Sequence, residues 1–333
     1  MGIKQLVKVL EKHAKNGIIK NHISDFKNKR IAIDFSNLIY KIIYTGKKNN
    51  REDYHYISEL ANITRNFLKN NITPIYVFDG EPPSVKNDEI QKRVDERNNT
   101  EEKVRKLEIL RKQIVIPERN NERIAALDKY REITEQIHKL STRCLYVTEE
   151  HIKLSKCLFK FNGIPYLQAP NEADYMCGYL SKKGLVEGCL SEDMDFLAYG
   201  VKKLLRNYNI FNGRLNEYNL DIILDDMEMT HSEFIDLCIL CGTDYHTIRG
   251  MGPVSAHKFI KNHGKLENII PLLENSKFVV PDNFDYHEIR DIFNLSEDID
   301  ITNDIDFGDV NEEMLAKLSK KTKIDYKKLY LRD

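Results

Sequence analysis

The amino-acid sequence predicts an α/β protein whose central, mostly parallel and twisted sheet is flanked by helices. Two observations support this prediction. Short apolar segments rich in β-branched residues alternate with segments of helical periodicity, and several of the apolar segments end at an acidic residue or a Gly/Pro turn. The predicted strands comprise residues 29–34, 73–79, 164–168, 186–191, 203–206 and 214–218.

Helical segments separate these strands and close the chain. The predicted helices comprise residues 1–15, 35–44, 56–70, 148–162, 171–180, 231–242 and 315–332. Asn171 is the predicted N-cap of its helix, which would place Glu172 and Asp174 in a first turn where the helix dipole favours anions. Cys238 and Cys241 form a C-x-x-C pattern, but no second pair or histidine follows at zinc spacing, so they are interpreted as core residues.

The composition is typical of an intracellular globular protein. The chain has 333 residues, of which 41% are hydrophobic and 31% charged, with a formal net charge of -1. No run approaches the ~20 apolar residues that a membrane span needs. Six cysteines without framework spacing indicate a reducing compartment. Because the net charge is close to zero, nucleic-acid binding would have to come from local patches.

Acidic residues follow or open the predicted elements at seven places: Asp34, Asp79, Glu172, Asp174, Asp193, Asp195 and Asp244. Simpler interpretations exist for some of them, since Asp34 could merely cap a helix. Two like charges ~4 Å apart repel by about 4 kcal/mol at an effective dielectric near 20. If these seven carboxylates converged in the fold, they would therefore require a hard cation such as Mg²⁺. Two such ions, about 3.5–4 Å apart, would activate a water and stabilise an in-line displacement at phosphorus.

Residues 84–143 form a different kind of segment, which is highly charged, slightly basic and helical, with Pro117 as a break. One interpretation is a solvated helical hairpin. The other is a gateway above the acidic site, with Lys86 and Arg93 at its base facing phosphate. The two side chains are seven residues apart and therefore share a helix face.

Two further features could contact nucleic acid. Gly250 and Gly252 belong to a Gly-Met-Gly-Pro turn at the start of a helix that also carries Lys258, and free backbone N–H groups at a helix N-terminus favour phosphate. Tyr40 and Tyr44 could stack on a base, although aromatic residues on an apolar helix face usually belong to the core.

In order and spacing, these motifs resemble those of the flap endonucleases, a family within the structure-specific 5′-nuclease superfamily. The matching blocks are the N-terminal MGI, AID at 32–34, VFDGEPP at 77–83, GIPYLQAPNEAD at 163–174, SEDMDFLAYG at 191–200 and DLCILCGTDY…IRGMGP over 236–253. The sequence is more similar to the replicative flap endonucleases than to the exonuclease branch, because VPDNF at 280–284 and the acidic stretch after it also match.

The resemblance implies specific roles in catalysis and metal binding. One metal ion would be held by Asp34, Asp79, Glu172 and Asp174, and a second by Asp193, Asp195 and Asp244. The implied catalytic residues are Lys86 and Arg93, at the foot of an arch, together with Asp34, Asp79 and Asp193. Two Mg²⁺ ions are the implied cofactors, and Mn²⁺ can replace them.

The resemblance also implies the DNA contacts. Tyr40 would stack on the nucleotide beside the scissile phosphate, and Gly2 would pack close to the substrate junction. Gly250, Gly252 and Lys258 would belong to a helix–two-turn–helix element, residues 249–264, which grips the duplex and holds K⁺ in the family. The remaining implied DNA contacts are Lys86, Arg93 and Glu172.

A single domain with a PIN-like 5′-nuclease core is the implied architecture. Its regions are an N-terminal nuclease region (1–83), a helical arch or clamp (84–147), an internal nuclease region (148–270) and a C-terminal extension, acidic and then basic (271–333). The expected substrate is branched double-stranded DNA with a 5′ flap, cut by a monomer during replication and repair, with weaker 5′–3′ exonuclease activity and no membrane partner. The expected location is intracellular: the nucleus of a eukaryotic cell, or a site of viral DNA replication.

Three departures from the family pattern stand out. Asp174 replaces the usual Glu, so its ion could be reached through water, and Glu81 replaces the usual Lys, which adds negative charge near the phosphate path. No clamp-binding motif precedes Asp333, so a sliding clamp is only a candidate partner. The alternatives are a mainly 5′–3′ exonuclease and a DNA-junction binder that does not cleave.

Overall fold

The computed structural model describes residues 3, 5–49, 53–83, 86–118, 121–273, 276–282, 284–294, 299 and 305–332. Within these residues, seven strands form one sheet in the order β1-β7-β6-β5-β2-β3-β4. The strands are β1 (Ile18–His22), β2 (Arg30–Asp34), β3 (Thr73–Phe78), β4 (Tyr166–Gln168), β5 (Gly188–Leu190), β6 (Lys203–Arg206) and β7 (Arg214–Asn219). The five strands from β6 to β4 run parallel, whereas β7 and β1 are antiparallel to their neighbours, so the predicted mostly parallel sheet is confirmed.

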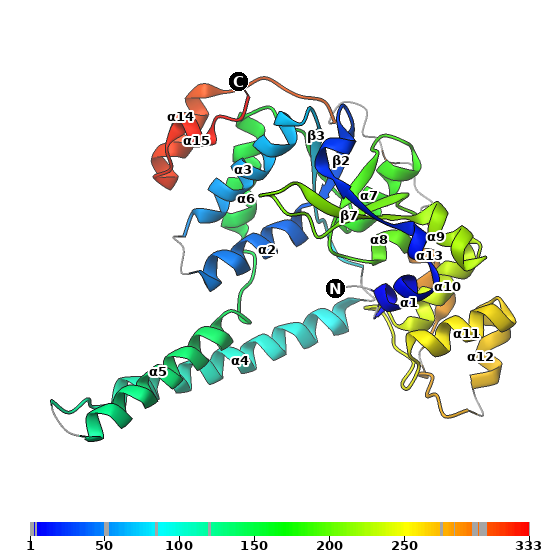
Figure 1. The fold of residues 1–333 in the computed structure, drawn as a ribbon, viewed down its shortest axis with the longest axis horizontal. Helices are drawn as coiled ribbons and strands as arrows, with labels where there is room; N and C mark the ends of the chain where they lie inside the picture. Colours follow the sequence, from blue (N-terminus) through cyan, green and yellow to red (C-terminus); the bar gives the residue numbers. More distant parts are fainter. Residues whose placement is uncertain are drawn as a thin grey trace.

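Helices cover both faces of this sheet (Figure 1). One face is covered by α1 (Leu6–His13), α7 (Ala173–Lys182), α8 (Asp195–Ala198), α9 (Leu220–Met227) and α10 (His231–Cys241). The other is covered by α2 (Phe35–Lys48), α3 (His55–Lys69), α6 (Glu149–Phe161), α14 (Glu312–Thr322) and α15 (Tyr326–Leu329). Strand side chains alternate between the two layers: Ala32 belongs to the first apolar cluster, whereas Ile31 and Ile33 belong to the second.

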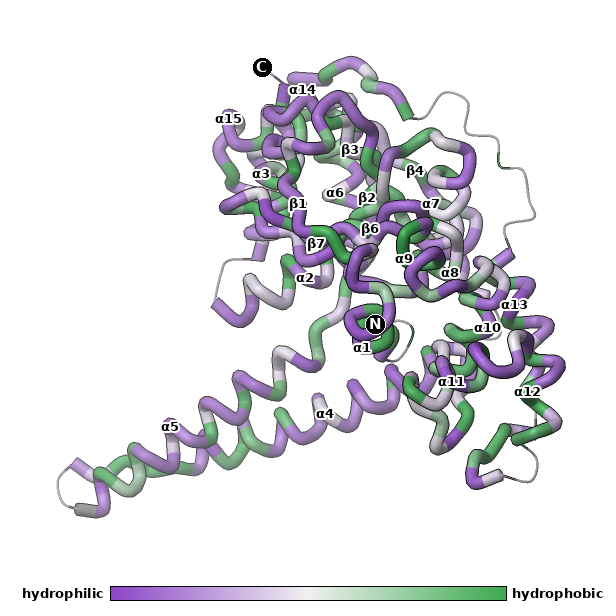
Figure 2. The backbone as a smooth tube through the Cα atoms, turned by 45° about the vertical axis from the view of Figure 1, so that its right-hand side comes forward, coloured by the Kyte–Doolittle hydropathy of each residue, from purple (hydrophilic) through white to green (hydrophobic). Residues whose placement is uncertain are grey.

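A long helical hairpin projects from this body (Figure 1). It consists of α4 (Asn87–Gln113) and α5 (Asn121–Ser141), which pack against each other as the sequence predicted. Polar and apolar residues are mixed along both helices (Figure 2). No helix in the described part of the chain is long and apolar enough to cross a membrane.

The helix–two-turn–helix segment expected at residues 249–264 comprises α11 (Pro253–His263) and the last part of the connection from α10. α10 ends at Gly242, where φ is +98°, and the connection turns again at Gly250, where φ is +87°. Two more helices follow, α12 (Leu266–Leu273) and α13 (Tyr286–Phe293). Cys238 and Cys241 are buried in α10, which confirms that they are core residues.

Several elements differ from the prediction: the helices α8, α9, α12 and α13 were not predicted, and the helix expected over 315–332 is divided into α14 and α15. The strand β1 was not predicted, because its sequence IIKNH lacks a clear apolar alternation; it forms by pairing with the distant β7. The predicted cap Asn171 was wrong, because α7 begins one residue later and Glu172 is its N-cap. A distant carboxylate replaces the local cap: the backbone N–H of Ala173 donates to Oδ1 of Asp79, at 2.8 Å.

Candidate metal centre

The seven predicted carboxylates gather at the edge of the sheet where the parallel strands end. Asp34 closes β2, and Asp79 directly follows β3. The other five open a helix or lie in a turn: Glu172 and Asp174 at the start of α7, Asp193 between β5 and α8, Asp195 as the first residue of α8, and Asp244 after α10. This is where open α/β sheets bind their ligands.

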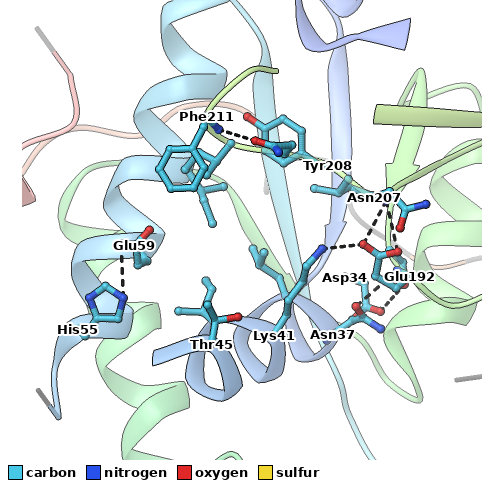
Figure 3. Close-up of a pocket in the computed structure, with 17 residues that line it drawn as sticks. Asp34, Asn37, Lys41, Thr45, His55, Glu59, Glu192, Asn207, Tyr208 and Phe211 are labelled. Atoms are coloured by element: carbon cyan, nitrogen blue, oxygen red, sulfur yellow. Dashed lines mark hydrogen bonds and ion pairs between the residues drawn. The ribbon is translucent and has the colours of Figure 1, made fainter. Parts of the chain in front are cut away.

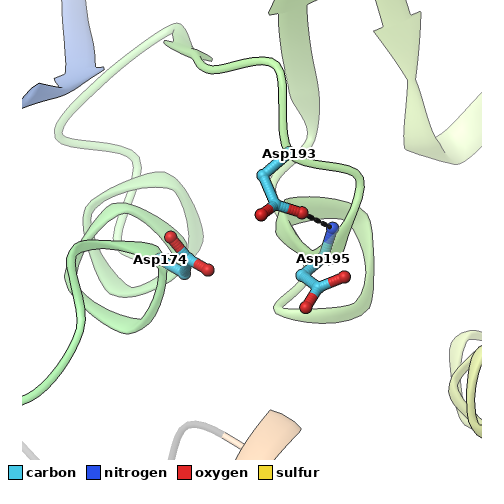
Figure 4. A group of neighbouring side chains, drawn as sticks. All are labelled: Asp174, Asp193 and Asp195. Atoms are coloured by element: carbon cyan, nitrogen blue, oxygen red, sulfur yellow. Dashed lines mark hydrogen bonds between the residues drawn. The ribbon is translucent and has the colours of Figure 1, made fainter. Parts of the chain in front are cut away.

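Three of these carboxylates lie closest together (Figure 4). Asp174, Asp193 and Asp195 each offer an oxygen within 4.8 Å of the others. Backbone groups hold two of them, since the N–H of Asp195 donates to Asp193 Oδ1 at 3.0 Å and the N–H of Ile3 donates to Asp195 Oδ1 at 2.7 Å. Although Asp174 is one methylene shorter than the Glu expected there, it reaches the group.

Asp34 is both a helix cap and a member of the cluster. Its carboxylate accepts hydrogen bonds from the N–H of Asn37, at 3.1 Å, and from Ser191 Oγ, at 2.8 Å. Ser191 Oγ in turn accepts from the N–H of Asp193, at 3.0 Å. A single hydroxyl therefore connects Asp34 with Asp193, a role that sequence patterns did not reveal although Ser191 adjoins the SEDMD acids.

Two cations from the base of the hairpin enter the cluster. Lys86, the N-cap of α4, donates to both oxygens of Glu172, at 2.7 and 2.6 Å. Arg93, in the second turn of α4, donates to Asp244 Oδ2 at 2.7 Å. Burial tends to lower the pKa of Lys86, but Tyr245, Glu172 and Asp174 outweigh it and raise that pKa. Both predicted basic residues thus face carboxylates in the DNA-free protein.

The remaining electrostatics show an excess of negative charge. Burial, reinforced by Asp79 and Asp193, raises the pKa of Asp34 to about 7. Burial and the neighbouring Asp193 likewise raise the pKa values of Asp174 and Asp195 well above their usual range. The carboxylates are held close together, all their donor atoms are oxygen, and the protein alone does not stabilise their ionised form. These residues therefore fit hard divalent cations such as Mg²⁺ or Mn²⁺.

A stability measurement can test this charge excess. We expect the metal-free protein to become less stable as the pH rises from about 4 to about 7. The pKa of Asp34 is about 7 in the folded protein, against its usual value of 3.8. Folding therefore favours the protonated carboxyl group. The resulting stabilisation is complete below pH 3.8 and is lost as the pH rises through about 7. Mg²⁺ should raise the melting temperature more at about pH 8 than at about pH 5. Equal shifts at both pH values would contradict the charge excess, and Asp34→Asn should weaken the pH dependence.

The predicted DNA contacts other than Lys86, Arg93 and Glu172 lie outside the cluster. Tyr40 and Tyr44 are 40% and 39% exposed on α2, with their rings 6.5 Å apart, so the alternative that they belong to the core was wrong. Lys258 is exposed on α11. Gly252 is the N-cap of α11, and a Cβ at this position would meet only open space. Gly2 lies outside the described residues.

A pocket beside Asp34 was not foreseen from the sequence (Figure 3). It has a volume of about 420 Å³ and lies between α2, α3 and the loop after β6. Lys41 donates to Glu192 across its rim at 2.8 Å, and the almost fully exposed Phe211 lines it from the loop. No local sequence pattern indicates such a pocket, because its walls come from four segments, at residues 34–45, 55–63, 190–192 and 207–211.

Comparison with known proteins matches nearly the whole chain. Two family models match: the XPG N-terminal domain over residues 1–100 and the XPG I-region over residues 163–244. The protein named Flap endonuclease 1 of Aedes aegypti is 35% identical over 95% of this chain and 81% of its own length. Its namesake from Candida glabrata is 36% identical over 92% of this chain and 78% of its own.

Solved structures show the same architecture. Flap endonuclease-1 from Methanococcus jannaschii superposes with a TM-score of 0.65 at 25% identity, over 94% of this chain and 93% of its own. The catalytic core of Rad2 in complex with DNA substrate gives a TM-score of 0.69 at 22% identity, over 98% and 97% of the two chains, and supports the fold.

Proposed function

Because the chain belongs to the flap endonuclease family, we propose that it is a divalent-metal-dependent nuclease that hydrolyses DNA at 5′ flaps, with weaker 5′–3′ exonuclease activity. The observation that carries the proposal is the cluster of Asp174, Asp193 and Asp195, whose oxygens lie within 4.8 Å of one another. Such a cluster has the donor set of a phosphoryl-transfer site.

The carboxylates would divide between two ions. Asp34, Asp79, Glu172 and Asp174 are proposed for one, and Asp193, Asp195 and Asp244 for the other. The closeness of Asp174 to both Asp193 and Asp195 supports a common site for the two ions. When bound, Mg²⁺ or Mn²⁺ supplies a more acidic water and neutralises charge on the reacting phosphate.

The two cations of α4 would change partners when DNA binds. In the free protein, Lys86 and Arg93 neutralise Glu172 and Asp244. A scissile phosphate and metal ions would compete for these contacts, leaving the ammonium and guanidinium groups to hold the phosphate and its developing charge. The ion pairs therefore keep both side chains at the site before substrate arrives.

More distant surfaces would hold the DNA. We assign Tyr40 to stacking beside the scissile phosphate, and Gly250, Gly252 and Lys258 to the duplex backbone, with K⁺ as a candidate ion at their turn. Gly2 is assigned to the junction from the sequence alone. The protein is proposed to act as a monomer in replication and repair, in the nucleus or at a viral replication site, with a sliding clamp as a candidate partner.

A labelled flap substrate tests the proposal. Incubation of the protein with a 5′-flap duplex and Mg²⁺ should release the flap by a cut near the junction, and chelation should stop the reaction. Release of mononucleotides from recessed ends would instead indicate a mainly 5′–3′ exonuclease. Tight binding of the junction without cleavage in Mg²⁺ or Mn²⁺ would overturn the proposal in favour of a non-cleaving binder.

A further inference from the structure

A chain of two hydrogen bonds leads from α6 to the metal cluster. Lys156, on α6, donates from Nζ to Oε1 of Gln168, at 2.6 Å. Gln168 is the last residue of the edge strand β4, and its Nε2 donates to the backbone carbonyl of Asp79, at 2.5 Å. A helix on the second face of the sheet is thereby joined to a residue of the carboxylate cluster.

The carbonyl that Gln168 holds lies just beyond the sheet. β3 ends at Phe78, so Asp79 follows the last paired residue of the strand. The side chain of Gln168 supplies the hydrogen bond to this carbonyl, between the backbone bonds from Ala169 N–H to Phe78 O and from Gly80 N–H to Asn171 O. On its other side, Asp79 Oδ1 accepts from the N–H of Ala173, at 2.8 Å. Asp79 is therefore held at its carbonyl by β4 and at its carboxylate by α7.

Lys156 and the carbonyl of Asp79 together determine which way the amide of Gln168 points. An ammonium group can only donate, so the amide must present its oxygen to Lys156 and its NH₂ group to Asp79. Lys156 also makes a cation–π contact, since its ammonium lies 4.8 Å from the centre of the Phe78 ring. The carbonyl of Asp79 can only accept and favours the same orientation, so Lys156 adds a second contact that holds the amide of Gln168 in place.

We propose that Gln168, oriented by Lys156, is a positioning residue that holds Asp79 in place for metal binding. This inference rests on the proposed metal-dependent nuclease function. Groups that orient a metal ligand typically contribute 10–100-fold to metal affinity. Neither side chain was singled out by the sequence, because the contact depends on the packing of α6 against the edge of the sheet.

Metal binding to the DNA-free protein provides the test, with Mn²⁺ titrated calorimetrically into wild type and variants. Gln168→Leu and Gln168→Glu should each weaken Mn²⁺ binding about tenfold. The Glu variant retains an acceptor for Lys156 but loses the donor to Asp79. A purely electrostatic effect of its extra negative charge would strengthen binding instead, so the sign distinguishes positioning from charge.

Variants of α6 complete the experiment. Lys156→Met should weaken Mn²⁺ binding like the Gln168 variants, and Lys156→Arg should restore most of it. Lys153→Met and Lys160→Met are matched controls, because both lysines line the same pocket on α6 as Lys156; they should bind Mn²⁺ like wild type. In cleavage assays, the Gln168 variants should need about tenfold more Mg²⁺ for half-maximal rate, with an unchanged KM for DNA.

The outcomes separate this inference from the function on which it rests. If wild type neither binds Mn²⁺ nor cuts a flap, the proposed function fails. If wild type does both and Gln168→Leu, folded as judged by its melting temperature, has the same Mn²⁺ affinity, only the positioning role is overturned. An equal loss in Lys153→Met and Lys156→Met would also overturn it, since the loss would then not depend on the contact with Gln168.

Discussion

Replacement of Asp193 by Asn is expected to slow flap cleavage in Mg²⁺ by roughly a thousandfold or more, with little change in affinity for the same DNA. Asp193 is buried, and its carboxylate lies in the closest group of potential metal ligands. Asn has nearly the same size, and its side-chain oxygen can still accept from the N–H of Asp195. The substitution therefore removes a charged ligand while the local fold is retained.

Single-turnover cleavage in Mg²⁺ and flap binding in Ca²⁺ would measure the two effects of Asp193→Asn separately. Glu313→Gln is a suitable control, because it removes an exposed acid on α14 that pairs with Lys317, away from the cluster. That variant should cleave like wild type. Wild-type cleavage by Asp193→Asn would exclude the cluster as the catalytic centre.

Lys86→Met is the second substitution with a large expected effect, a loss of about 10²–10³-fold in the cleavage rate. Flap affinity should fall much less, because a group that meets developing charge contributes mainly to the transition state. Mn²⁺ affinity in the absence of DNA should stay the same or increase, since Lys86 occupies both oxygens of Glu172 in the free protein. Arg93→Ala should show the same separation of rate from binding.

Lys92→Met provides the matched comparison for Lys86→Met, because Lys92 is an exposed lysine on the same helix. It should leave the cleavage rate close to that of wild type. If Lys86→Met lost rate and affinity to the same extent, Lys86 would be a simple DNA anchor. If it lost Mn²⁺ affinity, the ion pair with Glu172 would instead be required to build the metal site.

The sequence predicts best the position of the acids that follow the parallel strands, because strand direction determines where these acids lie. Parallel strands place their carboxyl ends at one edge, so acids such as Asp34 and Asp79, which follow such strands, had to lie near one another. The helical hairpin was equally clear, because residues 84–143 contain no Gly and their helical pattern is broken near Pro117.

What the sequence could not indicate are the contacts that depend on distant packing. Ser191 connects Asp34 to Asp193 only because β5 lies beside β2. Gln168 looks like an ordinary exposed residue at the end of a strand until α6 brings Lys156 against it. The error at Asn171 has the same origin, since the helix start is satisfied by Asp79 from another strand.

A movement of the projecting hairpin would displace its two basic side chains, Lys86 and Arg93, by different distances. Arg93 is seven residues beyond Lys86, or about 10 Å along α4 at 1.5 Å per residue, and α4 has 27 residues in all. A tilt of α4 by about 10° around its first residues would shift Arg93 by about 2 Å and break its 2.7 Å contact with Asp244. Lys86, at the start of the helix, would barely move. A force on the far end of the hairpin would therefore break the contact of Arg93 with Asp244 before that of Lys86 with Glu172.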